Sequence, residues 1–190
     1  SLAIRGPFPE TLNKWDELLA DHKVWGIGGS DTHGETYQMG PLRRIVFDYD
    51  HLFGTINTHA LLSEPWNGRL DHDAELLYEA LGRGRAFVGY DALSPTKGFS
   101  FEARHAGHSY TMGDEVTAQE DVHFDVHTPS AAHLRLMLNG FCVAESRGKQ
   151  LTHISRSPGA YRVEVLKRHM FAERGWIYSN PIFVKTRERR

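Results

Sequence analysis

The sequence predicts an α+β chain in two parts: an α/β segment over residues 1–95 and an immunoglobulin-like antiparallel β-sandwich over residues 96–190. The first part begins with a helix-like segment and a short apolar strand, the order of elements found in α/β proteins. From residue 98 onward, short segments of alternating polarity are separated by Gly, Pro and Asn, which is typical of a β-sandwich. We therefore expect two domains that meet near residue 95.

The α/β segment begins with a helix predicted for residues 10–22. Apolar side chains recur there at helical spacing, and Thr11 is a candidate N-cap; the apolar positions are Leu12, Trp15, Leu18 and Leu19. An apolar strand from Val24 to Ile27 is predicted next. In α/β proteins, functional sites collect at the carboxyl ends of such strands.

Four further elements are predicted before residue 95: an extended or mixed segment at 42–47, helices at 49–62 and 73–81, and a strand at 86–90. Asp71 or Asp73 is the expected N-cap of the last helix, and Gly82 its expected C-cap. These elements complete the α/β part.

The second part is predicted to contain strands at 98–104, 121–128, 132–139, 141–146, 150–155, 159–168 and 176–185. Within one of them, Val122, Phe124 and Val126 alternate with polar residues, which indicates a strand buried on one face. Asn139-Gly140 supplies a hairpin turn between two others.

Composition and charge exclude several classes of function. The formal net charge is −2, so the chain has no positive electrostatic field that would attract nucleic acid or an anionic membrane. No apolar run approaches the roughly 20 residues that a membrane-spanning helix needs, and no signal peptide is visible. Cys142 is the only cysteine, so a disulfide within the chain is excluded. We expect a cytoplasmic protein without nucleic-acid or membrane partners.

The stretch from Gly26 to Gly34 is the strongest candidate for chemistry. Its apolar strand runs into glycines and then presents Asp31 and His33. Side chains two apart in a strand point the same way, and the glycines let a ligand approach the backbone closely. A carboxylate and an imidazole so placed are suitable ligands for a divalent metal.

Two other Asp-x-His triplets occur in the chain, Asp121-Val-His123 and Asp125-Val-His127. Their polar side chains lie on one face of a predicted strand, so exposure of that face to solvent explains them, and an adventitious metal site is the alternative. Asp31 and His33 are the better candidates, because they follow a helix, an apolar strand and a Gly-Gly turn.

The segment Gly29-Ser30-Asp31-Thr32-His33 resembles the closing metal-binding motif of the PHP (polymerase and histidinol phosphatase) family of metal-dependent phosphoesterases. In that family the motif lies near the end of a distorted (β/α)7 barrel. Three further segments resemble a PHP subgroup with an added C-terminal β domain: Glu79–Val88, Gly159–Val165 and Trp176–Val184. The resemblance implies that residues 1–95 are the last α/β units of a PHP-type, TIM-like barrel.

The resemblance also implies a function and a metal site. Two or three divalent ions (Zn, Mn or Fe) would polarise a phosphate ester and lower the pKa of a bound water. Asp31 would ligate one metal and help to orient or deprotonate that water, and His33 would ligate a neighbouring metal. The hydroxyls of Ser30 and Thr32 are weaker candidates for holding these ligands in place. The expected substrate is a phosphorylated or ester small molecule.

The chain departs from the PHP pattern in its ligand set. PHP barrels begin with a His-x-His motif, which this sequence lacks, and two protein ligands rarely hold a catalytic zinc. We therefore expect the C-terminal portion of a hydrolase whose N-terminal barrel part is missing. Alone, it is expected to be inactive, to bind metal weakly and to self-associate. The alternative hypothesis is a β-sandwich binding or interaction module, for carbohydrate or another subunit, with a vestigial metal site.

Overall fold

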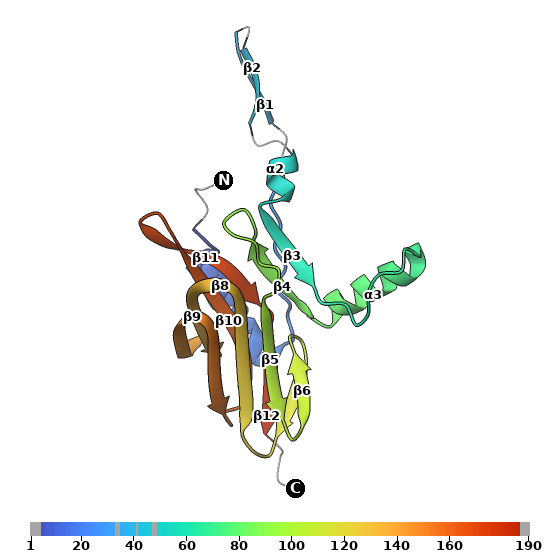
Figure 1. The fold of residues 1–190 in the computed structure, drawn as a ribbon, viewed down its shortest axis with the longest axis vertical. Helices are drawn as coiled ribbons and strands as arrows, with labels where there is room; N and C mark the ends of the chain where they lie inside the picture. The colour runs from blue at the N-terminus through green and yellow to red at the C-terminus, as the bar shows by residue number, and fades with distance from the viewer. Residues whose placement is uncertain (1–4, 33–34, 41, 47–48, 187–190) are drawn as a thin grey trace.

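The dominant feature of the computed structural model is one large, mostly antiparallel β-sheet that curls around a hydrophobic core (Figure 1). A small two-stranded hairpin stands apart from it. The structure describes residues 5–32, 35–40, 42–46 and 49–186.

Strands of the large sheet are short in the first half of the chain and long in the second. They are β3 (Ile56–Ala60), β4 (Ala86–Tyr90), β5 (Ser100–His105), β6 (His108–Thr111), β7 (Glu115–Ala118), β8 (Val122–Leu138), β9 (Phe141–Ser155), β10 (Gly159–His169), β11 (Ala172–Ser179) and β12 (Ile182–Thr186). The main path runs β3-β4-β11-β10-β8-β5-β6, while β9 pairs with β8, and β12 pairs with both β10 and β7. All these pairs are antiparallel except β7 with β12.

The two longest strands, β8 and β9, bend along their length. Their register shifts between His127 and Ala132 and again between Leu136 and Met137, and such irregularities bend a strand and increase its twist. Each long strand therefore unites two segments that the sequence predicted as separate strands. The predicted hairpin turn between β8 and β9 is confirmed, with positive φ at both Asn139-Gly140 positions.

One face of the curled sheet carries the core. The largest buried core side chains come from β5, β8, β10 and β11 and include Phe101, Phe124, Leu134, Leu136, Tyr161, Trp176 and Ile177. The alternation predicted for the first part of β8 is confirmed, because its apolar residues are buried while His123 and His127 are exposed. Tyr161 stacks on Phe124 with 4.2 Å between ring centroids.

The predicted fold class, an α+β chain containing the last α/β units of a PHP-type (β/α)7 barrel, is wrong, because the fold is mostly antiparallel β. In such a barrel successive strands are parallel, whereas β3 and β4 are antiparallel neighbours although α3 (Leu70–Gly82) lies between them in sequence. β4 also pairs with β11, so strands from both sides of residue 95 share one sheet. A domain boundary at that position stays a prediction. The β-rich second part does resemble a sandwich.

Helices α1 (Pro9–Asp21) and α3 confirm the helices predicted at 10–22 and 73–81, with different caps. Proline occupies the first turn of α1, where the N–H groups of a helix lack partners in any case. At the start of α3, the carboxylate of Asp73 accepts hydrogen bonds from the N–H groups of Asn67 and Gly68, both at 3.0 Å.

The helix predicted from Tyr49 to Leu62 is wrong beyond its first turn. Helix α2 spans only Tyr49–Phe53, and β3 begins three residues later. The buried Thr55 marks the change, because its hydroxyl donates to the carbonyl four residues earlier at 2.7 Å. Gly54 has low helix propensity, and the β-branched residues of β3 favour a strand.

The strand predicted from Val24 to Ile27 is also wrong. Residues 23–32 continue without a turn or bend but belong to no strand ladder. By contrast, the segment predicted as extended or mixed at 42–47 forms a strand, β2 (Leu42–Val46), which pairs antiparallel with β1 (Glu35–Met39).

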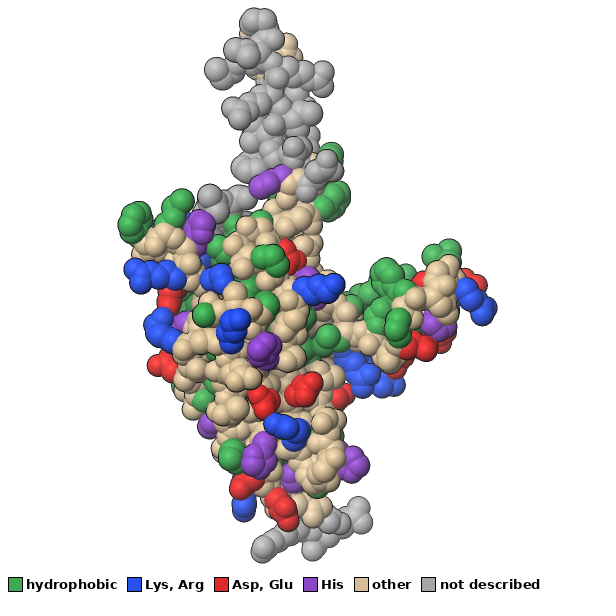
Figure 2. Space-filling model, viewed as in Figure 1, with side chains coloured by type: hydrophobic (Ala, Val, Ile, Leu, Met, Phe, Trp, Pro, Cys, Tyr) green, Lys and Arg blue, Asp and Glu red, His purple; other side chains and the backbone are tan. Residues whose placement is uncertain are grey.

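Two parts of the chain project from the curled sheet in Figure 1, the β1–β2 hairpin and helix α3. Hydrophobic side chains are visible on the α3 arm in Figure 2, and Leu70 and Tyr78 of this helix are 82% and 73% exposed. No helix within the described ranges has the length and apolar character that crossing a membrane requires.

Candidate functional site

The predicted site lies in the segment Gly26–Thr32, whose first residues are held in place by two side chains. The N–H of Gly26 donates to Asn180 Oδ1 (2.7 Å), and Asn180 Nδ2 donates to the Gly26 carbonyl (3.3 Å). Thr58 makes the equivalent pair of hydrogen bonds with Gly28, both 2.9 Å. Asn180 is 1% exposed. The segment is therefore attached to the sheet through side chains instead of a backbone ladder.

Close packing explains two of the glycines in this segment. A Cβ atom on Gly26 would lie 2.9 Å from the ring of Trp15, and one on Gly28 would lie 2.4 Å from Val88 Cγ1. Nothing lies within 4 Å of the corresponding position on Gly29. The glycines at 26 and 28 thus let the backbone approach the helix and the sheet. The close approach of a ligand, which was predicted for these glycines, stays a prediction.

Two tryptophans fasten the start of the segment. The indole N–H of Trp15 donates to the carbonyl of Val24 at 2.9 Å, and that of Trp25 donates to the carbonyl of Gly82 at 2.9 Å. Trp25 also packs edge-on against Phe183, with ring centroids 5.9 Å apart. The segment that leads to Asp31 is therefore fixed to α1, α3 and β12 as well as to the sheet.

Asp31 follows the fixed first residues of this segment and is exposed. Its φ of 47° ends the extended run, so the side-chain alternation assumed for a strand does not continue through it. Ser30 and Thr32 on either side hydrogen-bond to each other, with 2.7 Å between their hydroxyl oxygens. His33 lies outside the described residues. The assignment of Asp31 and His33 as metal ligands, and the weaker roles of Ser30 and Thr32, stay predictions.

Of the two predicted metal ligands, only Asp31 lies among the described residues. Within those residues, no group of three or more His, Cys, Asp or Glu side chains is arranged to hold a metal ion. An exposed carboxylate at a fixed backbone position has the chemistry of one ligand in a shared site, because divalent metals need three or more protein or solvent donors. Asp31 therefore fits such a metal only together with ligands beyond the described residues.

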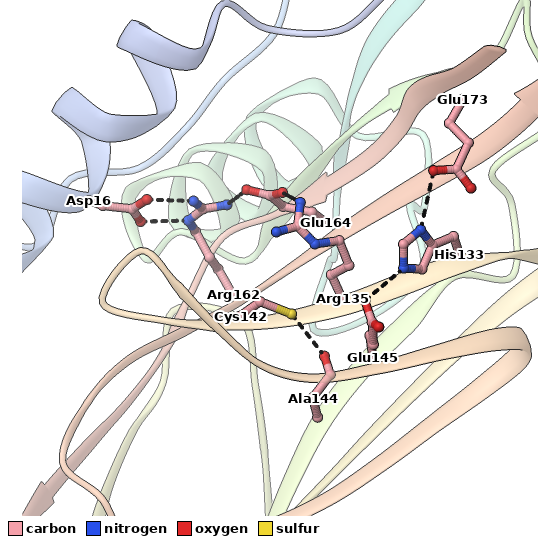
Figure 3. Close-up of polar contacts among 9 residues, drawn as sticks. All are labelled: Asp16, His133, Arg135, Cys142, Ala144, Glu145, Arg162, Glu164 and Glu173. Atoms are coloured by element: carbon pink, nitrogen blue, oxygen red, sulfur yellow. Dashed lines mark hydrogen bonds and ion pairs between the residues drawn. The ribbon is translucent and has the colours of Figure 1, made fainter.

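Asp16 of α1 has a structural role, as one end of a chain of ion pairs (Figure 3). Its carboxylate accepts two hydrogen bonds from Arg162 of β10, at 2.7 and 2.6 Å. Arg162 also donates to Glu164 at 2.6 Å, and Arg135 donates to the other oxygen of Glu164 at 3.2 Å. This chain of charges crosses from α1 over β10 to β8 (Figure 3). It joins α1 to the centre of the sheet.

The two Asp-x-His triplets of β8 belong to ion pairs on the outside of the sheet. Asp125 accepts a hydrogen bond from Arg104 at 2.7 Å, and Asp121 pairs with Arg156. Both carboxylates thus have cationic partners, which agrees with the interpretation of this face as a polar one.

A second polar cluster, around Asp91, was not predicted as a site. Its carboxylate accepts hydrogen bonds from the Thr96 hydroxyl (2.6 Å), the Thr96 N–H (3.0 Å) and Asn57 Nδ2 (2.9 Å), and lies 2.8 Å from His59 Nε2. Burial raises the pKa of Asp91, but the hydrogen bonds from Thr96, Asn57 and His59 outweigh it and leave the pKa lowered. The His59 ring stacks on Phe87, 4.6 Å between centroids.

The Asp91 cluster orients an imidazole and closes the turn after β4. Thr96 Oγ1 lies 3.0 Å from the same His59 nitrogen that faces Asp91, so the polar atoms largely satisfy one another. The sequence signal was an aspartate directly after an apolar strand, which predicts only a turn. The cross-strand approach of His59 was hidden because residues 49–62 were predicted as helix.

We compared the chain with protein-family models, with curated proteins and with solved structures, and none of them matched it.

Proposed function

We propose that this chain contributes Asp31 and His33 to the divalent-metal site of a metal-dependent hydrolase, with a phosphoester as the substrate. The proposal keeps the resemblance of Gly29–His33 to the PHP motif and does not depend on a barrel fold. Zn, Mn or Fe are the metals that such a carboxylate and imidazole pair would serve.

The observation that supports the proposal most is the placement of Asp31. Four hydrogen bonds with Asn180 and Thr58 fix the backbone that leads to it, while Asp31 is an exposed residue. Metal sites need ligands held within a fraction of an ångström of a fixed geometry. Asp31 meets that requirement although it is not buried, because hydrogen bonds hold the backbone that precedes it.

When bound, the metal would supply Lewis-acid polarisation of the phosphoryl group and a water of lowered pKa. The carboxylate of Asp31 would hold one metal and help to orient or deprotonate the attacking water. His33 would bind through a neutral ring nitrogen, so its protonation below about pH 6 would weaken the site. The remaining ligands would come from outside the described residues.

The proposal is tested by hydrolysis of p-nitrophenyl phosphate, with protein produced from its full gene in its own host. Activity should require Zn, Mn or Fe and be abolished by a chelator. Asp31→Ala and His33→Ala should each lower kcat/KM by about 100-fold or more, since a ligand matters more than the outer partners, whose loss costs 10–100-fold. Asp21→Ala, at an exposed residue at the end of α1, is the matched control and should leave activity unchanged. Equal activity in all three variants would exclude the proposed site.

A binding or interaction module is the second candidate function. It is favoured by an open groove of about 910 Å³ that runs along Val24–Gly29 and is lined mainly by apolar side chains. Metal-free protein with no hydrolytic activity in the test above would support this candidate over the first.

A further inference from the structure

The groove beside Val24–Gly29 lies between α1 and the sheet. The helix and the residues before it provide one wall, including Phe8 and Leu18, and Ile56, Val88 and Tyr178 line it from β3, β4 and β11. Phe8 is 77% exposed and Ile27 is 75% exposed. Exposed apolar surface of this kind marks interaction sites in many proteins.

The backbone of Val24–Gly29 has one satisfied edge and one open edge. Gly26 and Gly28 direct their N–H and C=O groups to Asn180 and Thr58. Within the described part of the chain, the N–H and C=O groups of Trp25, Ile27 and Gly29 make no hydrogen bond. In an extended chain successive residues direct these groups to opposite sides. The N–H and C=O groups of these three alternate residues therefore face the same side, away from Asn180 and Thr58.

This open edge differs from the free edge of strand β9. Protein sheets guard exposed edges with charged residues, prolines or bulges, and β9 carries Glu145, Arg147 and Lys149. Residues 24–29 contain neither a charged residue nor a proline. The edge therefore lacks the features that discourage another strand from pairing.

The N–H and C=O groups along the open edge determine what kind of partner can pair with it. Donors and acceptors alternate at a two-residue repeat, a spacing that the edge of another polypeptide strand reproduces. The charged side chains that line the groove, Glu10 and Lys14, are of opposite sign, so they select no charge. An apolar side chain at every second position of the incoming strand would enter the groove.

We propose that Val24–Gly29 is a docking edge for an extended, uncharged segment of a partner polypeptide, which adds to it as a β-strand with alternate apolar side chains in the groove. This binding needs neither Asp31 nor His33. It therefore stands or fails independently of the proposed metal site.

The test measures amide hydrogen exchange by NMR in ¹⁵N-labelled protein. The probe is a capped heptapeptide in which Thr and Val alternate, and the control peptide has the same composition with its valines adjacent. Without peptide, the amides of Gly26 and Gly28 should be protected, and those of residues 25, 27 and 29 should exchange freely. The alternating peptide should slow the latter three by about tenfold or more, and the control peptide should not.

A matched pair of variants distinguishes pairing from simple burial. Ile27→Pro removes one N–H of the open edge, and no existing hydrogen bond among the described residues is lost with it. The backbone should tolerate the change, because the residue before a proline favours an extended conformation. It should weaken binding of the alternating peptide by about tenfold, whereas Ile27→Val should not. Unchanged binding by Ile27→Pro, or no protection at saturating peptide, would overturn the proposal. Protection that instead rises with protein concentration alone would overturn it in favour of a second copy as the occupant.

Discussion

Asp16 and Arg162 face each other across the junction of α1 with the sheet, and two hydrogen bonds of 2.6 and 2.7 Å join their side chains. The side chain of Arg162 is 2% exposed and that of Asp16 is 12% exposed. Trp15 covers the guanidinium, whose carbon lies 5.3 Å from the ring centroid. α1 also lines the groove beside Val24–Gly29, so this ion pair fixes one wall of that groove.

Asp16→Asn is expected to lower the free energy of unfolding by about 3 kcal/mol, because breaking a buried pair leaves a buried charge without its partner. Glu164 still binds Arg162, which keeps the loss at the lower end of the usual range. Urea denaturation measures the change. Glu17→Gln is the control, since Glu17 pairs with Lys14 on the exposed face of the same helix; it should cost about 0.5 kcal/mol or less. Equal losses in the two variants would contradict this account.

The hydroxyl of Thr58 should be essential for holding the Gly26–Thr32 segment. Thr58→Val keeps the shape of the side chain and removes both hydrogen bonds to Gly28. We expect a loss of about 1–3 kcal/mol in unfolding free energy, because the half-buried N–H and C=O of Gly28 lose their partner. Thr58→Ser retains the hydroxyl and should recover most of the loss; failure to recover it would mean that packing, and not hydrogen bonding, is responsible.

The packing of Gly28 against Val88 gives a prediction that a double mutant can test. Gly28→Ala places a methyl group 2.4 Å from Val88 Cγ1 and should cost about 1–3 kcal/mol through overpacking. Val88→Ala in the same chain removes the clash, so the double variant should be more stable than the sum of the single effects predicts. Gly29→Ala, where a Cβ meets nothing within 4 Å, is the control. Strictly additive effects would show that the two side chains do not meet.

The Asp91 cluster predicts how stability changes with pH. The folded-state pKa of Asp91 lies below its ordinary value of 3.8. Its contribution is therefore fully present above that value and is lost as pH falls through the folded-state pKa. The stability difference between wild type and Asp91→Asn should accordingly be largest near neutral pH and shrink below about pH 4. Chemical denaturation across this range measures it, and a difference that grows on acidification would contradict the pKa shift.

Elements with a repeated local pattern could be predicted from the sequence. α1, β4 and the first part of β8 have apolar residues at the spacing of a helix or a strand, and each was found. The errors concern pairing. The apolar run in β4 suits a barrel strand as well as its actual place between β3 and β11, and nothing local to residues 86–90 distinguishes the two.

The candidate site shows the same limit. Gly26 and Gly28 were predicted to let a ligand approach the backbone, whereas the structure shows them packed closely against Trp15 and Val88. Their hydrogen-bond partners, Asn180 and Thr58, are 154 and 30 residues away in sequence, and isolated polar residues give no local signal of such contacts. The strand assumed for Val24–Ile27 fails for the same reason, since side chains take the place of a neighbouring strand.

The central claim, that Asp31 and His33 bind a divalent metal, is tested most directly by the metal content of protein produced from its full gene in its own host. Elemental analysis after gel filtration should find Zn, Mn or Fe in the wild type and in Asp21→Ala. The same measurement should find about tenfold less metal, or lower still, in Asp31→Ala and His33→Ala. Metal content that is unchanged in both of these variants, with their unfolding transitions intact, would contradict the claim.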